Sequence, residues 1–340
     1  MFTGNPYRCT VPSSPIVIAH RGASGYRPEH SRAAYELAFE LGADAVEPDI
    51  VATKDGVLVV RHENEISGTT DVAAHPEFAD RRTTKTIDGI ELTGWFTEDF
   101  TWDELSTLRV VERIPELRPE SARFDGSEPV LRLRDVRDML DAASARRGEQ
   151  IALVAEIKHA TYFASIGLQL DKLFAAEMAD WATEENLVIE SFEQSVLLKI
   201  RARGIPGRIV YLIEDGGSPS DRDDTTYAAQ LSDESLASLA TEVDGISVDR
   251  SLIVRADATG STAAVSDIVD RAHGHGLLVF TWTLRAENRF LARNHRIGDK
   301  PGDLGDWATE FALIMGSGVD GVFADQPDRA LIARAALHAS

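Results

Sequence analysis

Residues 20–62 read HRGASGYRPEHSRAAYELAFELGADAVEPDIVATKDGVLVVRH, and this stretch indicates both the fold and the chemistry. Apolar runs of strand length flank a helical pattern over 31–41, which begins at a capping Ser31 and stops at Gly42. Histidines and carboxylates stand within the apolar runs or directly after them. The segment therefore predicts strand–helix–strand units that carry polar residues where the strands end.

Similar apolar runs recur along the whole chain. Near-continuous runs of this length are typical of strands buried on both faces, as in a parallel sheet. The candidate strands are 16–20, 45–51, 57–61, 151–157, 187–192, 208–213, 245–248, 277–283 and 321–324. Helices are expected at 31–41, from Leu133 to a stop near Gly148, and around 194–203, 262–273 and 328–337.

Strand–helix alternation over 340 residues favours an α/β fold of the TIM (β/α)₈ barrel type, although one strand candidate is surplus. The connection between residues 51 and 57 is too short for a crossover helix, so 57–61 should return antiparallel. A turn centred on 54–56 is expected to place His62 across from Asp49. Pro48 does not suit a central strand and should mark a strand end or a bulge.

Residues from 63 to about 129 interrupt the alternation. We interpret 1–340 as a single barrel domain with an insertion at about 63–129 that lies over the barrel mouth, after the third strand candidate. One short helix is expected near 102–108, and Trp95 and Trp102 give the insertion hydrophobic groups to pack.

The composition limits the partners. A formal net charge of −21 repels nucleic acid and anionic lipid headgroups, so an anionic substrate needs a locally positive site. A single cysteine, Cys9, excludes an intrachain disulfide, and no apolar run is long enough to insert stably in a membrane. Residues 1–15 lack the features of a signal peptide, which predicts a cytoplasmic protein. Export is the alternative if this start omits a leader, and the oligomeric state stays unknown.

Three carboxylates suggest a metal. Glu47 and Asp49 are two residues apart on one strand, so both side chains leave the same face, and Glu156 and Lys158 repeat this spacing on a later strand. Buried carboxylates repel one another unless a cation lies between them. A solvent-facing acidic pair and an interstrand salt bridge are the alternatives. Without a cysteine nearby, a hard cation such as Ca²⁺ or Mg²⁺ is favoured over zinc.

Two histidines and an arginine complete the candidate site. His20 ends the first strand, where barrel enzymes place their active sites, and it can act as an acid or a base. His62 is the second candidate proton carrier. Arg21 offers a planar fork of donors for phosphate oxygens. The alternatives are a buried structural histidine, a surface histidine and a structural ion pair, respectively.

These residues resemble the glycerophosphodiester phosphodiesterase family. The resemblance runs through HRGASG, RPEH, GADAVEPDIVATKDGVLVVRHE, AEIKH, SFEQ (191–194), FTWT (280–283) and VDGVFADQP (319–327). The long insertion resembles the larger, periplasmic-type bacterial branch. The resemblance implies a TIM barrel with one divalent metal at its mouth. It also implies hydrolysis of glycerophosphodiesters, such as glycerophosphocholine or glycerophosphoethanolamine, to sn-glycerol 3-phosphate and an alcohol.

The resemblance also implies roles by motif position. It implies that Glu47, Asp49 and Glu156 are the metal ligands and that His20 and His62 are the acid–base pair. It further implies that Arg21 and Lys158 contact the phosphate, that Glu29 is a further site glutamate, and that Trp282 forms a wall of the pocket. The chain departs from the pattern at His30, where many members have asparagine, at Glu63, where aspartate is usual, and at Pro48. These departures bear on the pocket rim and on substrate preference.

Several alternatives stay open at this stage. The nucleophile is either water or the neighbouring hydroxyl of the glycerol moiety. A phospholipase D-like enzyme acting on lysophospholipids or sphingomyelin would need an apolar surface beside the mouth. The remaining alternative is a barrel that binds a phosphodiester or a metal without turnover.

Overall fold

The computed structural model of the chain describes residues 14–337. Cys9 and nearly all of the segment that we inspected for a signal peptide lie outside the described residues. Within them, no helix combines the length and the hydrophobicity that crossing a bilayer requires.

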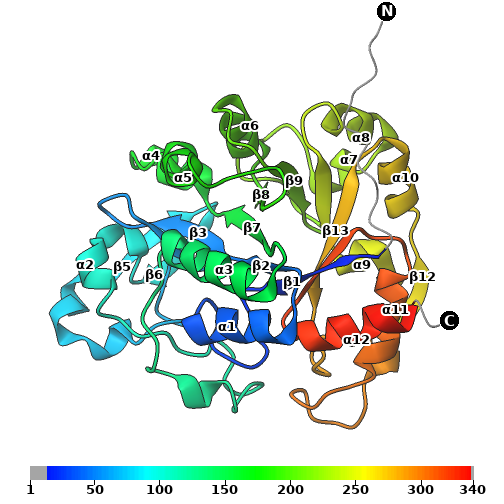
Figure 1. The fold of residues 1–340 in the computed structure, drawn as a ribbon, viewed down its shortest axis with the longest axis horizontal. Coiled ribbons are helices and arrows are strands. Elements are labelled where there is room, and N and C mark those ends of the chain that lie inside the picture. The colour runs from blue at the N-terminus through cyan, green and yellow to red at the C-terminus, as the bar shows by residue number, and fades with distance from the viewer. Residues whose placement is uncertain (1–13, 338–340) are drawn as a thin grey trace, which may run out of the picture.

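Eight parallel strands close into a barrel, as the alternation predicts. The ring closes because β2 pairs with both β1 and β7, and every neighbouring pair within it is parallel. Helices surround the strands (Figure 1). The barrel strands are β1 (Ile16–His20), β2 (Ala45–Glu47), β7 (Ala152–Ile157), β8 (Leu187–Ser191), β9 (Arg208–Ile213), β10 (Gly245–Asp249), β13 (Leu278–Leu284) and β14 (Gly321–Ala324).

The expected antiparallel return is confirmed, but its register is not. β3 (Asp49–Ala52) continues β2 beyond a break at Pro48 and pairs antiparallel with β4 (Leu58–Val60). The Arg61 N–H donates to the Asp49 carbonyl at 3.0 Å, so Arg61 rather than His62 lies opposite Asp49. The physical reason is that a hairpin centred on Asp55 pairs positions six residues to either side.

The helices largely follow the expected pattern. α1 begins after Ser31, whose hydroxyl accepts a hydrogen bond from the Ala34 N–H, and it ends at a left-handed Gly42. The longer helices are α1 (Arg32–Leu41), α3 (Leu133–Arg147), α5 (Leu170–Met178), α6 (Gln194–Ala202), α11 (Trp307–Met315) and α12 (Pro327–Leu337). The shorter ones are α4 (Ala160–Ser165), α7 (Tyr227–Gln230), α8 (Asp233–Leu239), α9 (Arg250–Ile253) and α10 (Ile268–Gly274).

The helix expected at 262–273 is wrong over its first part. β12 (Thr262–Val265) forms an exposed antiparallel hairpin with β11 (Val254–Ala256), and α10 begins only after Asp267. Thr262 and Val265 are β-branched, which suits a strand better than a helix.

The insertion is richer in structure than expected and borders the barrel mouth on one side, in cyan in Figure 1. Its helix α2 (Trp102–Leu105) has a capping box at Thr101. β5 (Thr83–Ile87) and β6 (Ile90–Gly94) form a hairpin whose turn residues Asp88 and Gly89 both have positive φ, the geometry that Asp-Gly favours. The 3₁₀ turns are η1 (Val72–Ala74), η2 (Pro76–Arg81), η3 (Thr97–Asp99) and η4 (Ala122–Phe124); a fifth, η5 (Arg293–His295), lies outside the insertion.

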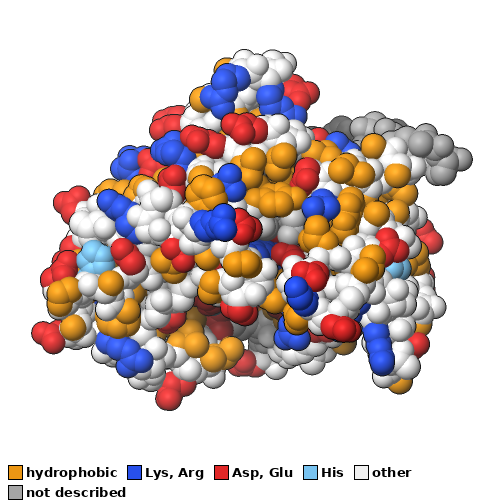
Figure 2. All heavy atoms as spheres, turned by 90° about the horizontal axis from the view of Figure 1, so that it is seen from below, with side chains coloured by type: hydrophobic (Ala, Val, Ile, Leu, Met, Phe, Trp, Pro, Cys, Tyr) orange, Lys and Arg blue, Asp and Glu red, His pale blue; other side chains and the backbone are white. Residues whose placement is uncertain are grey.

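The barrel interior is filled by apolar side chains, so it is a plug rather than a pore. The plug consists of Ile18, Ala45, Val154, Val188, Val210, Leu278, Phe280 and Phe323. Because side chains alternate along a strand, the residues two positions further on point the same way and stand above the plug. On the face shown in Figure 2, acidic and basic side chains are interspersed, without a continuous basic patch.

Candidate active site

The site residues come from the layer directly above the plug. His20, Glu47, Glu156, Glu190 and Trp282 each lie two residues beyond a plug residue on their strands, and all line one cavity of about 790 Å³ at the strand ends. Arg21, His62 and Lys158 line it as well. Asp49 and Glu29 are not among the lining side chains.

A tight turn after β1 positions Arg21. Arg21 and Gly22 both have positive φ, 59° and 80°. A Cβ on Gly22 would lie 2.6 Å from the carbonyl carbon of Ala34 in α1, so only glycine fits this close approach of turn and helix. Arg21 itself is held in a conformation that non-glycine residues rarely adopt, a feature that often occurs at functional sites.

Glu47, Glu156 and Glu190 form a convergent group of buried carboxylates. Each offers one oxygen, and these three oxygens lie within 4.8 Å of one another. Burial, and then the nearby carboxylates, raise the pKa values of Glu47 and Glu190 well above the ordinary range. Burial likewise raises the pKa of Glu156 to about 8, although Lys158 opposes the shift. The nearby positive charge, chiefly Lys158 Nζ at 2.9 Å from Glu156, therefore does not compensate all three carboxylates.

Asp49 is held differently. Its Oδ2 lies 3.0 Å from both Arg21 Nε and His30 Nε2, and Lys158 Nζ lies 3.9 Å from its other oxygen. Burial would raise the pKa of Asp49, but Arg21 and the other cations outweigh it, so the pKa stays well below the ordinary range. The structure brings Glu190, which the sequence reasoning missed, into the carboxylate group. Its sequence signal was a glutamate inside the apolar run at 187–192. The expected ligand Asp49 is in register with Glu156 on the neighbouring strand, and its buried Oδ1 has no hydrogen-bond partner among residues 14–337.

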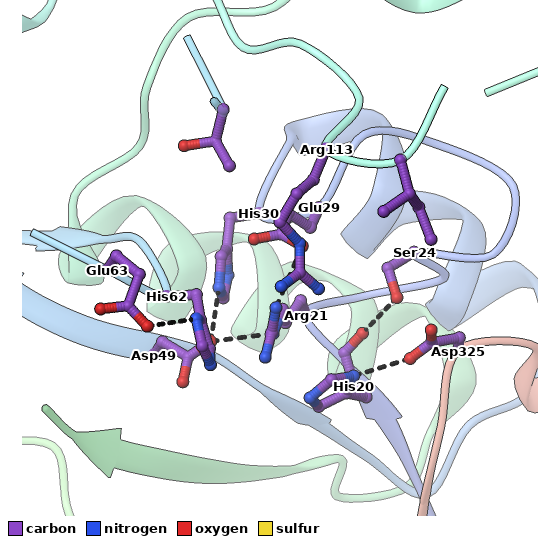
Figure 3. Close-up of polar contacts among 12 residues, drawn as sticks. His20, Arg21, Ser24, Glu29, His30, Asp49, His62, Glu63, Arg113 and Asp325 are labelled. Atoms are coloured by element: carbon purple, nitrogen blue, oxygen red, sulfur yellow. Dashed lines mark hydrogen bonds and ion pairs between the residues drawn. The ribbon is translucent and has the colours of Figure 1, made fainter. Parts of the chain in front are cut away.

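The two predicted proton carriers line the same cavity, and each is oriented by a carboxylate (Figure 3). His20 Nδ1 lies 2.7 Å from Asp325 Oδ1, and His62 Nδ1 lies 2.9 Å from Glu63 Oε1. His62 Nε2 is 3.4 Å from Lys158 Nζ. Burial, and then the charge of Arg21, lower the pKa of His20 to about 4 and that of His62 to about 3. Both imidazoles are therefore neutral at pH 7.

Asp325 is a second residue that the sequence reasoning missed. It directly follows β14 and receives ion pairs from Arg118 Nη2 at 2.6 Å and Arg285 Nε at 2.8 Å. Burial would raise its pKa, but these guanidinium groups and His20 keep it well below the ordinary range. A permanently ionised Asp325 favours the tautomer in which His20 Nδ1 carries the proton and Nε2 is free.

Glu29 lies behind the cationic side chains. Its Oε2 accepts from Arg21 Nη1 at 3.0 Å and contacts Arg113 Nε at 2.9 Å. Arg113 comes from the insertion and lines the cavity. Glu29 therefore orients two guanidinium groups toward the space where an anionic substrate group would lie.

A family model for the "Glycerophosphoryl diester phosphodiesterase family" matches residues 20–329. A glycerophosphodiester phosphodiesterase of Arabidopsis thaliana (GDPD6) is 32% identical over 296 residues, covering 82% of this chain and 77% of the relative. One of Haemophilus influenzae is 24% identical and covers 96% and 91%. A solved structure from Oleispira antarctica, a phosphodiesterase in complex with sn-glycerol-3-phosphate, has a TM-score of 0.59 at 18% identity, covering 94% and 96%.

The fold and the site define a barrel hydrolase with a carboxylate-rich mouth. The chain belongs to the glycerophosphoryl diester phosphodiesterase family, whose activity is the hydrolysis of glycerophosphodiesters.

Proposed function

We propose that this chain hydrolyses glycerophosphodiesters to sn-glycerol 3-phosphate and an alcohol at the cavity described above, with one divalent cation, Ca²⁺ or Mg²⁺. The observation that carries the proposal is the convergence of three buried carboxylates beside two imidazoles. The family match supports the reaction, and the Oleispira protein binds the product that the proposal names.

The residues present fit a hard cation. Glu47 Oε1 and Glu190 Oε2 are buried and have no hydrogen-bond partner among residues 14–337, and Glu156 completes the group. The group offers only carboxylate oxygens and neither cysteine nor histidine, and oxygen is the ligand that Ca²⁺ and Mg²⁺ prefer. When bound, the cation would neutralise negative charge on the phosphate and act as a Lewis acid. Asp49, the remaining expected ligand, would lie beside it and orient Arg21 and Lys158.

The cations of the chain bind the phosphate in this proposal. Arg21 and Lys158 line the cavity next to the carboxylate group, and Arg113 adds a third positive charge from the insertion. These side chains are fixed in advance by Glu29, Asp49 and Glu156, so they need little reorganisation when charge develops on the phosphate oxygens.

The two histidines move the protons. One neutral imidazole takes the proton from the attacking hydroxyl, either water or the neighbouring glycerol hydroxyl, as the new P–O bond forms. The other returns a proton to the alcohol oxygen as its P–O bond breaks. The incoming phosphate opposes the effect of Arg21, which lowers the pKa of both rings, so the substrate itself favours protonation of one of them. Asp325 would stabilise the imidazolium form of His20.

The lysophospholipid alternative is less well supported. An acyl chain would need a broad apolar surface at the mouth. Among the large hydrophobic side chains that are exposed within residues 14–337, only Ile90 also lines the cavity.

The test is release of glycerol 3-phosphate from glycerophosphocholine by the purified protein. EDTA should abolish turnover and Ca²⁺ or Mg²⁺ should restore it. His20→Ala and His62→Ala should each lower kcat by about 10²–10⁴-fold, the usual worth of one proton-transfer group, with the fold unchanged by circular dichroism. His275→Ala, which removes an exposed imidazole that does not line the cavity, is the matched control. Near-normal turnover by both alanine variants would refute the assignment.

A further inference from the structure

One side of the cavity carries carboxylates that have no cation of their own. Glu214, Asp215 and Asp249 line it and form no ion pair with any residue of the described range 14–337. They lie outside the convergent group at Glu47. Asp249 is fixed in place, because its Oδ1 accepts a hydrogen bond from the Ser251 N–H at 2.7 Å.

Aromatic rings separate these carboxylates from the phosphate-binding cations. Lys158 Nζ lies 5.6 Å from the centroid of the Phe192 ring. Phe192 meets Trp282 edge to face, with the ring centroids 5.6 Å apart and an interplanar angle of 86°. Trp282 is in register with Asp249 on the neighbouring strand. Across the cavity, the Lys158 ammonium group is therefore followed by the Phe192 and Trp282 rings and then by the Asp249 carboxylate. We call Phe192, Trp282, Glu214, Asp215 and Asp249 the acidic–aromatic side.

The metal proposed above does not offset this negative charge. A divalent ion and Lys158, whose Nζ lies 2.9 Å from Glu156, would together compensate the three charges of that carboxylate group and leave no positive charge for the acidic–aromatic side. Glu190, a member of the carboxylate group, stands two residues before Phe192, which directly follows β8; it lines the cavity and is 1% exposed, so the two sides of the cavity adjoin here. Arg250 also lines this side, but its guanidinium is bound by Glu310 and by the Phe290 carbonyl.

The surroundings of Glu214 show how little positive charge reaches this side. Burial, and then the Asp249 and Asp215 carboxylates, raise the pKa of Glu214 above its ordinary value, against only a weaker effect of Lys158. A cationic ligand between these groups would relieve their mutual repulsion.

We propose that the acidic–aromatic side binds the leaving alcohol of the substrate and selects alcohols that carry an ammonium group. This inference rests on the proposed function, because the phosphate must lie at the carboxylate group and Lys158 for the alcohol to reach this side. The cavity is then charged at both ends in the sense that matches a zwitterionic diester: cations for the phosphate, and carboxylates with ring faces for the headgroup.

The chemistry also ranks the ammonium groups. A quaternary ammonium has no N–H to donate and is recognised by aromatic faces and by diffuse negative charge. A primary ammonium is more strongly hydrated and loses more on leaving water. Phe192, Trp282 and the neighbouring Tyr227, whose ring centroid lies 6.4 Å from that of Phe192, therefore favour choline over ethanolamine.

The test compares kcat/KM for glycerophosphocholine, glycerophosphoethanolamine and glycerophosphoglycerol, whose headgroup is neutral. The wild-type holoenzyme should prefer the choline diester to the glycerol diester by about tenfold or more. The double variant Glu214→Gln/Asp249→Asn should reduce this ratio about tenfold, mainly through KM, because both substitutions keep size and remove charge. Asp223→Asn removes one charge from an exposed residue that does not line the cavity and should leave the ratio unchanged.

The outcomes separate this inference from the proposed function. If all three diesters are hydrolysed and the double variant keeps the wild-type ratio, the inference is overturned while the hydrolysis stands. If the wild type hydrolyses none of them, the proposed function fails. Calorimetric titration with choline then decides the inference: binding by the wild type that the double variant loses supports it, and equal or absent binding in both overturns it.

Discussion

Two sets of buried carboxylates share the mouth of this barrel, and they differ in their partners. Glu29, Asp49 and Asp325 each contact at least one guanidinium group. Glu47, Glu156 and Glu190 form no ion pair with any arginine of the described residues, and only Glu156 contacts a cation, Lys158 Nζ at 2.9 Å. All six residues are at most 8% exposed, so burial alone does not distinguish the sets.

This difference indicates which of the two sets could bind a cation. Arginine partners keep the pKa values of the first set below the ordinary range, whereas burial and mutual repulsion raise those of the second. A buried carboxylate without a partner is costly, so the second set is the one that a metal would stabilise. The first set would orient the groups that bind phosphate and move protons.

The largest expected effect is on metal affinity, when one carboxylate of each set is replaced in separate variants. Glu190→Gln should raise the dissociation constant for the metal about 100-fold or more, and Asp49→Asn only about 10-fold, because Asp49 would act through its neighbours. Calorimetric titration of each variant with Ca²⁺ and Mg²⁺ measures both constants. A greater loss for Asp49→Asn would show that Asp49 is itself a ligand and favour the ligand set that the family resemblance implies.

Replacing Asp325 tests whether a carboxylate of the first set orients His20 for proton transfer. Asp325→Asn should lower kcat about 100-fold at neutral pH, because an amide neither fixes the His20 tautomer nor stabilises its imidazolium form. Asp325 raises the pKa of His20 against the stronger effect of burial, so its loss should move the acid limb set by His20 to lower pH. A pH profile of kcat/KM decides the matter. Lower activity with an unmoved acid limb would indicate a merely structural role.

Metal affinity should rise with pH, because the carboxylates of the second set, Glu47, Glu156 and Glu190, must lose their protons to bind the cation. Their pKa values are raised, so protons compete with the cation, and affinity should rise about tenfold per pH unit and per displaced proton below the pKa of about 8 for Glu156. Titration in two buffers of different ionisation enthalpy counts the released protons. The Asp49 charge raises the pKa values of Glu47 and Glu156, so Asp49→Asn should weaken the dependence. Affinity that is independent of pH between 6 and 8 contradicts the comparison.

The smallest expected effect is on thermal stability and comes from His159, whose imidazole contacts the carboxylates of Asp88 and Glu63. His159 Nδ1 lies 2.6 Å from Asp88 and its Nε2 lies 3.1 Å from Glu63, which ties the insertion to the barrel. Although burial opposes it, these hydrogen bonds raise the pKa of His159 to about 9. The resulting stability, at most about 3 kcal/mol, is complete below the unfolded pKa of about 6.5 and is lost as pH rises through about 9.

His159→Gln should therefore lower the melting temperature by a few degrees at pH 6, and the difference from wild type should shrink above pH 9. Thermal unfolding at several pH values measures it. A difference that grows with pH would mean that the ring stabilises the structure in its neutral form.

Much of the scaffold follows from local pattern. Apolar runs of four to seven residues and the two-residue alternation predicted the strands and the faces that their polar residues occupy. The capped segment before Gly42 predicted α1, and the short connection after Val51 predicted the antiparallel return. The hairpin at Asp88 was also within reach of local signals, since Asp-Gly between alternating residues favours it.

The carboxylate sets were not predictable in the same way. Whether a buried acid has a cation depends on residues far away in the chain: Arg118 reaches Asp325 across 207 positions, and Glu190 meets Glu47 only because the barrel closes. The strands, their faces and the chemical groups at their ends can be predicted from sequence alone, because they depend on neighbours a few residues apart. Which of these acids contact a cation and which do not follows only from the folded chain, because charge compensation acts through space.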